Sequence, residues 1–202
     1  MNIRAFQTPA TLFADYTGRF SRLWEGFDWS PIERLAYELR DCLQTGRQVF
    51  LCGNGGSSGN ANHLANDFLY PVTKMPGAGL RVQSLSSNSQ VLTCLANDEG
   101  YDQVFSLQLA VLAREGDVLI AFSGSGNSAN ILRALDEARK IGMTSYAVLG
   151  FSGGKAKQLA DVPIHLAVDD MQIAEDAQIV IGHMIMQWLY AQRGDIVAAR
   201  EV

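Results

Sequence analysis

The feature that most constrains the fold is a pair of glycine-rich turns, each set between an apolar run and a helical pattern. The first turn is Gly53-Asn54-Gly55-Gly56-Ser57-Ser58, which follows the strand expected at residues 48–52. The second is Ser123-Gly124-Ser125-Gly126-Asn127-Ser128, which follows residues 118–122 and precedes a helical pattern. Because the carboxyl ends of parallel strands share one edge of a sheet, both turns are expected to face one crevice.

The second turn, here called the serine loop, has the chemistry of an anion site. Backbone N–H groups and the positive end of the following helix would point at one spot, and three serines add hydroxyl donors. The loop lacks the lysine and spacing of a P-loop, and it is not G-x-G-x-x-G. We interpret it as a cradle for a phosphate monoester. The alternative is ordinary loop composition.

Apolar runs and helical patterns alternate along the chain, which predicts an α/β fold with a single doubly wound, five-stranded parallel sheet. Strands are expected at residues 48–52, 80–85, 117–122, 145–149 and 164–168. Helices are expected at residues 59–68, 88–96, 101–113, 129–141 and 173–192, with turns at 97–100 and 152–154.

Two helical patterns precede the first strand, at residues 11–27 and from Ser30, a good N-cap, to about residue 46. We expect residues 1–46 to be a helical segment that packs on the sheet or on a neighbouring subunit. Residues 47–202 are expected to form one structural unit.

Composition limits the function classes. The chain has 202 residues and a net charge of −5, which argues against a nucleic-acid groove. We see no signal peptide and no run long enough to span a bilayer, so no membrane partner is expected. Cys42, Cys52 and Cys94 show no C-x-x-C spacing, which favours reduced thiols and a cytoplasmic location.

Four side chains stand out as residues that could take part in chemistry. His63 and Asp67 lie four apart on one predicted helix face, and Glu175 and His183 lie on the apolar C-terminal helix. The alternatives are a surface hydrogen bond for the first pair, a charge at a helix N-terminus for Glu175 and a core histidine for His183. His165 is assigned no role.

Several motifs in one order resemble the sugar isomerase (SIS) family and, within it, the phosphoheptose isomerases. The resemblance covers residues 48–189 and rests on Gly53-Asn54-Gly55-Gly56-Ser57, His63, Asn97-Asp98-x-Gly100-Tyr101, Gly116-Asp117-Val118-Leu119-Ile120, Ser123-x-Ser125-Gly126-Asn127-Ser128 and Ile181-Gly182-His183.

The resemblance implies a sheet of flavodoxin-like order and a homotetramer with active sites between subunits. It implies isomerisation of sedoheptulose 7-phosphate to D-glycero-D-manno-heptose 7-phosphate through an enediol, for the heptose of lipopolysaccharide. It implies zinc, one ion per subunit, and no nucleotide cofactor.

Carried over residue by residue, the resemblance implies three groups of site residues. The substrate and phosphate contacts are Asn54, Gly55, Gly56, Ser57, Asn97, Asp98, Ser123, Gly124, Ser125, Ser128 and Glu175. The metal positions are His63, Asp67, Glu175 and His183. Asp67 and His183 are the acid–base pair, and which of them takes the carbon-bound proton is left open.

Three departures from the family pattern leave the substrate open. Asp67 stands where the family usually has Glu, Glu175 stands where it usually has Gln, and an Arg expected after the first helix is missing. Glu175 and His183 would also lie about 12 Å apart on a continuous helix. They could then share one ion only if Glu175 preceded the helix or if different subunits contributed.

Two other functions are compatible with the sequence. One is a non-catalytic SIS protein that binds a sugar phosphate or a protein partner such as a replication initiator. The other is an isomerase for a different sugar phosphate, which the departures at Asp67 and Glu175 favour.

Overall fold

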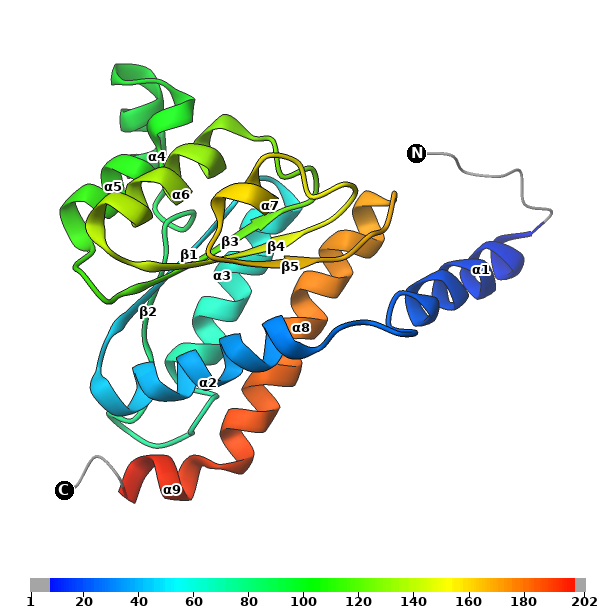
Figure 1. The fold of residues 1–202 in the computed structure, drawn as a ribbon, viewed down its shortest axis with the longest axis horizontal. Helices are drawn as coiled ribbons and strands as arrows, with labels where there is room; N and C mark the ends of the chain where they lie inside the picture. Colours follow the sequence, from blue (N-terminus) through cyan, green and yellow to red (C-terminus); the bar gives the residue numbers. More distant parts are fainter. Residues whose placement is uncertain (1–7, 199–202) are drawn as a thin grey trace.

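The computed structural model describes residues 8–198 and contains a five-stranded, all-parallel sheet in the order β2-β1-β3-β4-β5 (Figure 1). The strands are β1 (Gln48–Gly53), β2 (Arg81–Ser84), β3 (Val118–Ser123), β4 (Thr144–Leu149) and β5 (Val162–His165). The predicted fold class is confirmed.

The middle of the sheet is apolar because helices cover both of its faces. β1, β3 and β4 are buried along almost their whole length, whereas β2, at one edge, is mostly not. Parallel strands covered on both faces have no polar face to alternate with, which explains their nearly continuous apolar sequences.

The order in which the chain adds strands to the sheet reverses between β1 and β3, and the candidate site lies at this position. From β1 the chain goes to β2 on one side, then returns to pair β3 with the other side of β1. Gly53 at the end of β1 lies opposite Phe122, one residue before the serine loop. The two glycine-rich turns are therefore neighbours at the switch point of the sheet, where α/β folds hold ligands.

Two helical layers enclose the sheet, as Figure 1 shows. One hydrophobic core lies between one face of the sheet and the helices α2 (Ser30–Thr45), α3 (Gly56–Leu69) and α8 (Met171–Ala191). The other core unites the second face with α5 (Ser106–Leu112), α6 (Ala129–Ile141) and α7 (Ala156–Leu159). The remaining helices are α1 (Pro9–Arg22), α4 (Ser89–Asp98), the 3₁₀ turn η1 (Tyr101–Gln103) and α9 (Arg193–Ala198).

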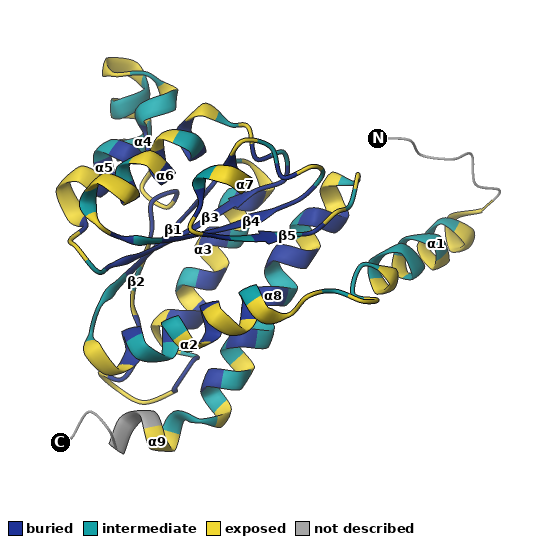
Figure 2. Ribbon diagram, viewed as in Figure 1, coloured by how far each residue is buried: buried dark blue, intermediate teal, exposed yellow. Residues whose placement is uncertain are grey.

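The two N-terminal helices behave differently. α2 buries an apolar stripe that includes Leu35, Leu39 and Leu43, whereas no residue of α1 is buried. α1 projects from the body of the molecule (Figures 1 and 2). The division of the chain at residue 46 stays a prediction.

Several element boundaries differ from the sequence prediction for local reasons. The first helix ends at Arg22, before Gly26, whose φ of 68° belongs to the left-handed region. Ser30 is the first residue of α2 rather than its N-cap, and β5 ends at His165 rather than at residue 168. The predicted helix 101–113 is interrupted between η1 and α5, and α7 and α9 were not predicted. Residues 97 and 98 end α4 instead of forming a turn.

The N-terminus of α8 is held by Asp170, which also connects it to α1. The Asp170 carboxylate accepts hydrogen bonds from the backbone N–H groups of Gln172 and Ile173 and pairs with Arg19. Tyr16 donates a hydrogen bond to Asp176 at 2.6 Å. Among residues 8–198, no helix is both long enough and apolar enough to cross a membrane.

Replacing Asp170 with alanine is expected to lower the free energy of unfolding by about 1–2 kcal/mol, since it removes an N-cap and an ion pair. Partial burial would raise the pKa of Asp170, but the bonds from Arg19, Ile173 and Gln172 hold it below the usual value. The stabilisation is therefore present above about pH 4 and declines as the pH falls through the lower folded-state pKa. Urea unfolding of both proteins at several pH values checks this. Asp136→Ala, an exposed control, should change stability by less than about 0.5 kcal/mol.

Candidate functional site

The serine loop is a compact turn with ordered hydroxyl groups. Ser123 is buried, and its Oγ accepts a hydrogen bond from the backbone N–H of Gly126 at 3.0 Å. The Oγ of Ser125 accepts one from the N–H of Asn127 at 3.3 Å. Ser128 is the N-cap of α6, and within the described chain its side chain makes no capping bond. The first turn of α6 also contains no acidic side chain. The N-terminus of α6 can therefore bind an anionic group of a ligand.

The loop that follows β4 holds the serine loop in place. The carbonyl of Gly126 accepts a hydrogen bond from Ala156 N–H at 2.9 Å, and the Asn127 side chain accepts one from Lys155 N–H at 3.1 Å. A Cβ atom at Gly126 would overlap the backbone carbonyl of Gly153. This close approach of two backbones requires glycine, and it fixes the shape of the loop.

Both glycine-rich turns line one cavity of about 240 Å³ at the switch point. Its lining consists of Asn54, Gly55, Gly56, Ser57, Phe122, Ser123, Gly124, Ser125, Ser128, Met171 and Glu175. None of the described residues that line it carries a positive charge. The expectation that both turns face one crevice is confirmed, whereas the binding roles of these residues stay predictions.

The Asn54 side chain belongs to a polar network that the sequence analysis missed. Asn54 and the buried Asn130 exchange two side-chain hydrogen bonds of 2.8 Å, and Tyr101 donates one to Asn54 at 2.9 Å. Asn130 is the second residue of α6, and only the pairing of β1 with β3 brings it beside Asn54. The network joins the two turns and orients the Asn54 amide beside the cavity.

Glu175 enters the same cavity from α8 and lies against the start of α3. Its carboxylate accepts a hydrogen bond from the backbone N–H of Ser57. A Cβ atom at Gly56 would overlap that carboxylate. Burial and the nearby charge of Asp176 raise the pKa of Glu175 above its usual value, although the bond from Ser57 opposes the change.

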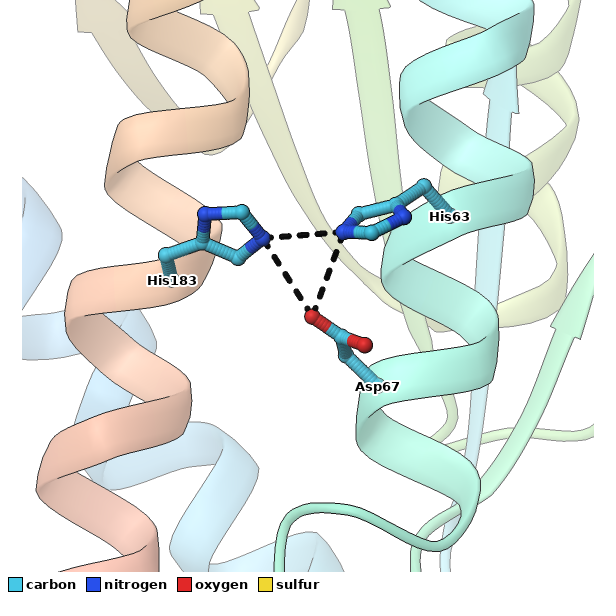
Figure 3. A group of neighbouring side chains, drawn as sticks. All are labelled: His63, Asp67 and His183. Carbon is cyan, nitrogen blue, oxygen red and sulfur yellow. Dashed lines mark hydrogen bonds and ion pairs between the residues drawn. The ribbon is translucent and has the colours of Figure 1, made fainter.

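A second group, here called the triad, consists of His63 and Asp67 of α3 and His183 of α8 (Figure 3). The Nε2 atoms of the two histidines are 2.9 Å apart. Asp67 Oδ2 lies 3.4 Å from His63 Nε2 and 3.3 Å from His183 Nε2. Asp67 is 8% exposed, whereas both histidines are more open to solvent. The three side chains point toward one another between α3 and α8 (Figure 3).

The donor set of the triad fits a zinc ion. The three ligand atoms lie within 4.8 Å of one another. Two ligands at about 2.0–2.1 Å from a tetrahedral zinc are about 3.4 Å apart, close to the two distances that Asp67 makes. Three protein ligands would leave a fourth position for water or substrate, as in catalytic zinc sites.

Glu175 does not belong to this group in the single chain. α8 is continuous from Met171 to Ala191, so Glu175 lies two turns from His183, or about 12 Å along the axis. His63 is likewise about 10 Å along α3 from Gly56. The structure therefore brings three of the four predicted metal positions together in one chain and places Glu175 in the cavity. The metal role of all four residues stays a prediction. Asn97 and Asp98 are exposed at the end of α4 and do not line the cavity.

Gly182 determines how closely α3 and α8 approach beside the triad. A Cβ atom at Gly182 would overlap the side chain of Leu64, the neighbour of His63 in sequence. The two helices can therefore approach closely only with glycine at this position. Gly182 belongs to the motif Ile181-Gly182-His183, and the motif alone does not predict this packing role.

Gly182→Ala is expected to lower stability by about 1–3 kcal/mol through overpacking and to weaken zinc binding at least tenfold, because it separates His183 from His63. Urea unfolding and zinc titration check the two effects. Gly59→Ala, at an exposed helical site with nothing near its Cβ, is the control and should leave zinc affinity unchanged. Unchanged zinc affinity in Gly182→Ala would contradict the packing role.

Comparison with known proteins agrees with this geometry. The family model described as the SIS domain matches residues 15–150. The phosphoheptose isomerase of Clostridium acetobutylicum is 39% identical over 154 residues, covering 76% of this chain and 78% of that protein. The phosphoheptose isomerase of Desulfovibrio desulfuricans is 36% identical over 156 residues, covering 77% and 74%.

A solved structure is similar over nearly the whole chain. The phosphoheptose isomerase of Neisseria gonorrhoeae superposes with a TM-score of 0.83 and 29% identity, covering 91% of this chain and all of that one. The chain therefore belongs to the SIS-domain family and, within it, to the phosphoheptose isomerases.

Proposed function

We propose that this protein is an aldose–ketose isomerase that converts sedoheptulose 7-phosphate to D-glycero-D-manno-heptose 7-phosphate. The observation that carries the proposal is the contact between Asp67 and His183, at 3.3 Å, together with a cavity built from two helix N-termini. Isomerisation through an enediol moves a proton between adjacent carbons. It needs an acid–base pair and a fixed grip on the phosphate.

The residues divide this work between them. The serine loop and the N-terminus of α6 bind the phosphate, and this binding energy positions the sugar carbons. Asp67 and His183 transfer the proton between the two carbons and their oxygens. Asn54, held by Asn130 and Tyr101, offers its amide to a sugar hydroxyl at the cavity wall.

His63, Asp67 and His183 would hold a zinc ion, one for each subunit, through the atoms that face one another in the triad. The acid–base pair would then exchange protons through its other atoms, Asp67 Oδ1 and His183 Nδ1. When bound, zinc polarises a substrate carbonyl or hydroxyl oxygen. The chain's own contribution is to fix the two imidazoles and the carboxylate within contact of one another. We propose no nucleotide cofactor.

We also propose that active sites form between copies of the chain in a homotetramer. The triad and the cavity of one chain are about 10 Å apart along α3, so a triad from another copy could complete each cavity. Beside His183, an apolar groove of about 260 Å³ runs between α2 and α8, lined by Trp29, Ile32, Tyr37, Met184, Ile185 and Trp188. Trp29 and Tyr37 of this groove are 40% and 50% exposed, and a contiguous exposed apolar surface supports burial in an assembly. The product would supply lipopolysaccharide heptose in the cytoplasm.

The test is to incubate the purified protein with sedoheptulose 7-phosphate, with and without added zinc, and to follow the sugar phosphates by NMR. Formation of the aldose phosphate is the expected result. Glu175 and Asp67 depart from the family's usual residues, so pentose and hexose phosphates are tested in parallel. Binding of a sugar phosphate without conversion of any would contradict the proposal and favour a regulatory SIS protein.

A further inference from the structure

The N-termini of α3 and α6 both lie at the cavity, and only that of α3 is in contact with an acidic side chain among the residues described. Neither α3 nor α6 has an acidic residue in its first turn, and neither N-cap makes a side-chain bond within the described residues. Both ends would therefore attract an anion. At α6 that end is open, whereas at α3 the Glu175 carboxylate is already bound.

Several contacts hold Glu175 at the end of α3. Its carboxylate accepts the hydrogen bond from Ser57 N–H, and Gly56 provides the space it occupies. Its backbone carbonyl accepts a bond from Asn60 Nδ2 at 2.8 Å, and the same amide bonds Gln178 at 3.0 Å. α3 and α8 are thus joined at Glu175 and at Gln178, so the carboxylate is positioned by packed helices rather than by a loop.

The charges of the cavity follow from this arrangement. The Glu175 carboxylate is part of the cavity wall, and the N-terminus of α6 has no acidic side chain in its first turn. None of the lining residues described is basic. A ligand phosphate at the serine loop would use the open end. A second anionic group on that ligand would meet the Glu175 carboxylate in a cavity of about 240 Å³, where like charges repel strongly.

We propose that Glu175 is a specificity-determining residue that restricts the cavity to ligands with a single anionic group. Phosphate monoesters of neutral polyols and sugars are accepted, with hydroxyl groups donating to the free lone pairs of Glu175. Sugar bisphosphates and phosphorylated sugar acids are disfavoured. This inference rests on the proposed function in one respect, namely that the ligand is a sugar phosphate.

The experiment compares two ligands that share a six-carbon chain and a terminal phosphate, glucitol 6-phosphate and 6-phosphogluconate. Their dissociation constants are measured by calorimetry for the zinc-free wild-type protein, Glu175→Gln and Glu175→Ala. Gln is nearly the same size as Glu and can still reach Ser57, so it removes the charge with little change in shape. Asp136→Asn is the control, because Asp136 is an exposed carboxylate on α6 that does not line the cavity.

The wild type should bind glucitol 6-phosphate at least about tenfold more tightly than 6-phosphogluconate, and Glu175→Gln should reduce that ratio about tenfold. Glu175→Ala should reduce it similarly, and Asp136→Asn should leave it unchanged. Equal binding of both ligands by the wild type, or an unchanged ratio in both Glu175 variants, would overturn the inference and leave the proposed function intact. Binding of neither ligand would overturn the proposed function and this inference with it.

Discussion

Asp67→Asn is expected to lower kcat by about a thousandfold while the protein stays folded, the largest catalytic effect of any substitution considered. Asp67 is nearly buried and contacts both histidines of the triad through Oδ2. Asn keeps the shape but cannot exchange a proton at this site, and general acid–base groups contribute about 10²–10⁴-fold. Steady-state kinetics with sedoheptulose 7-phosphate at saturating zinc measures the effect.

Two controls separate this role from a structural one. Asp67→Glu restores the family's usual residue and should retain substantial activity. His165→Asn alters a histidine that bonds the Phe151 carbonyl and Lys157, outside the triad, and should leave kcat within about threefold. If Asp67→Asn kept wild-type turnover, neither proton transfer nor zinc binding by Asp67 would be required.

Gly126→Ala is expected to have the largest effect on the serine loop, lowering stability by about 2–4 kcal/mol and sugar-phosphate affinity at least a hundredfold. Gly126 has a φ of 65°, which costs a residue with a Cβ about 1–2 kcal/mol. The added Cβ would also overlap the Gly153 carbonyl, a backbone atom that cannot rotate away. The loop would have to move off the support that the turn after β4 provides.

Urea unfolding and calorimetric titration with glucitol 6-phosphate measure the two effects of Gly126→Ala. Gly59→Ala is again the matched control. Gly59 lies in a helix with space around its Cβ, so the change should stabilise the protein by about 0.5–1 kcal/mol. Wild-type ligand affinity in Gly126→Ala would show that the shape of the serine loop does not determine phosphate binding.

Most of the fold could be predicted from the sequence because buried strands and glycine-rich turns are recognised from neighbouring residues alone. The helix at Ala129–Ile141 was predicted at its observed bounds, since Gly142 ends it with a left-handed φ of 85°. The expectation that both turns face one crevice needed only the rule for parallel sheets. By contrast, α7 has four residues, too few for a helical period to be visible in the sequence.

What the sequence could not supply were contacts between distant elements. Asn130 was missed because its bonds to Asn54 depend on strand order, and Gly182 was missed because its neighbour Leu64 lies on another helix. The four-residue metal set was carried over by resemblance. The continuous helix α8 separates Glu175 from His183 and places its carboxylate at α3 instead.

The most direct test of the central claim, that the triad moves a carbon-bound proton, is hydrogen exchange followed by NMR. Sedoheptulose 7-phosphate is incubated in D₂O with the wild-type protein and with Asp67→Asn. Deuterium should enter the substrate carbon that loses its proton in the wild type, and at most slowly in the variant. Absence of exchange in the wild type with bound ligand, or exchange at the wild-type rate in Asp67→Asn, would contradict the account.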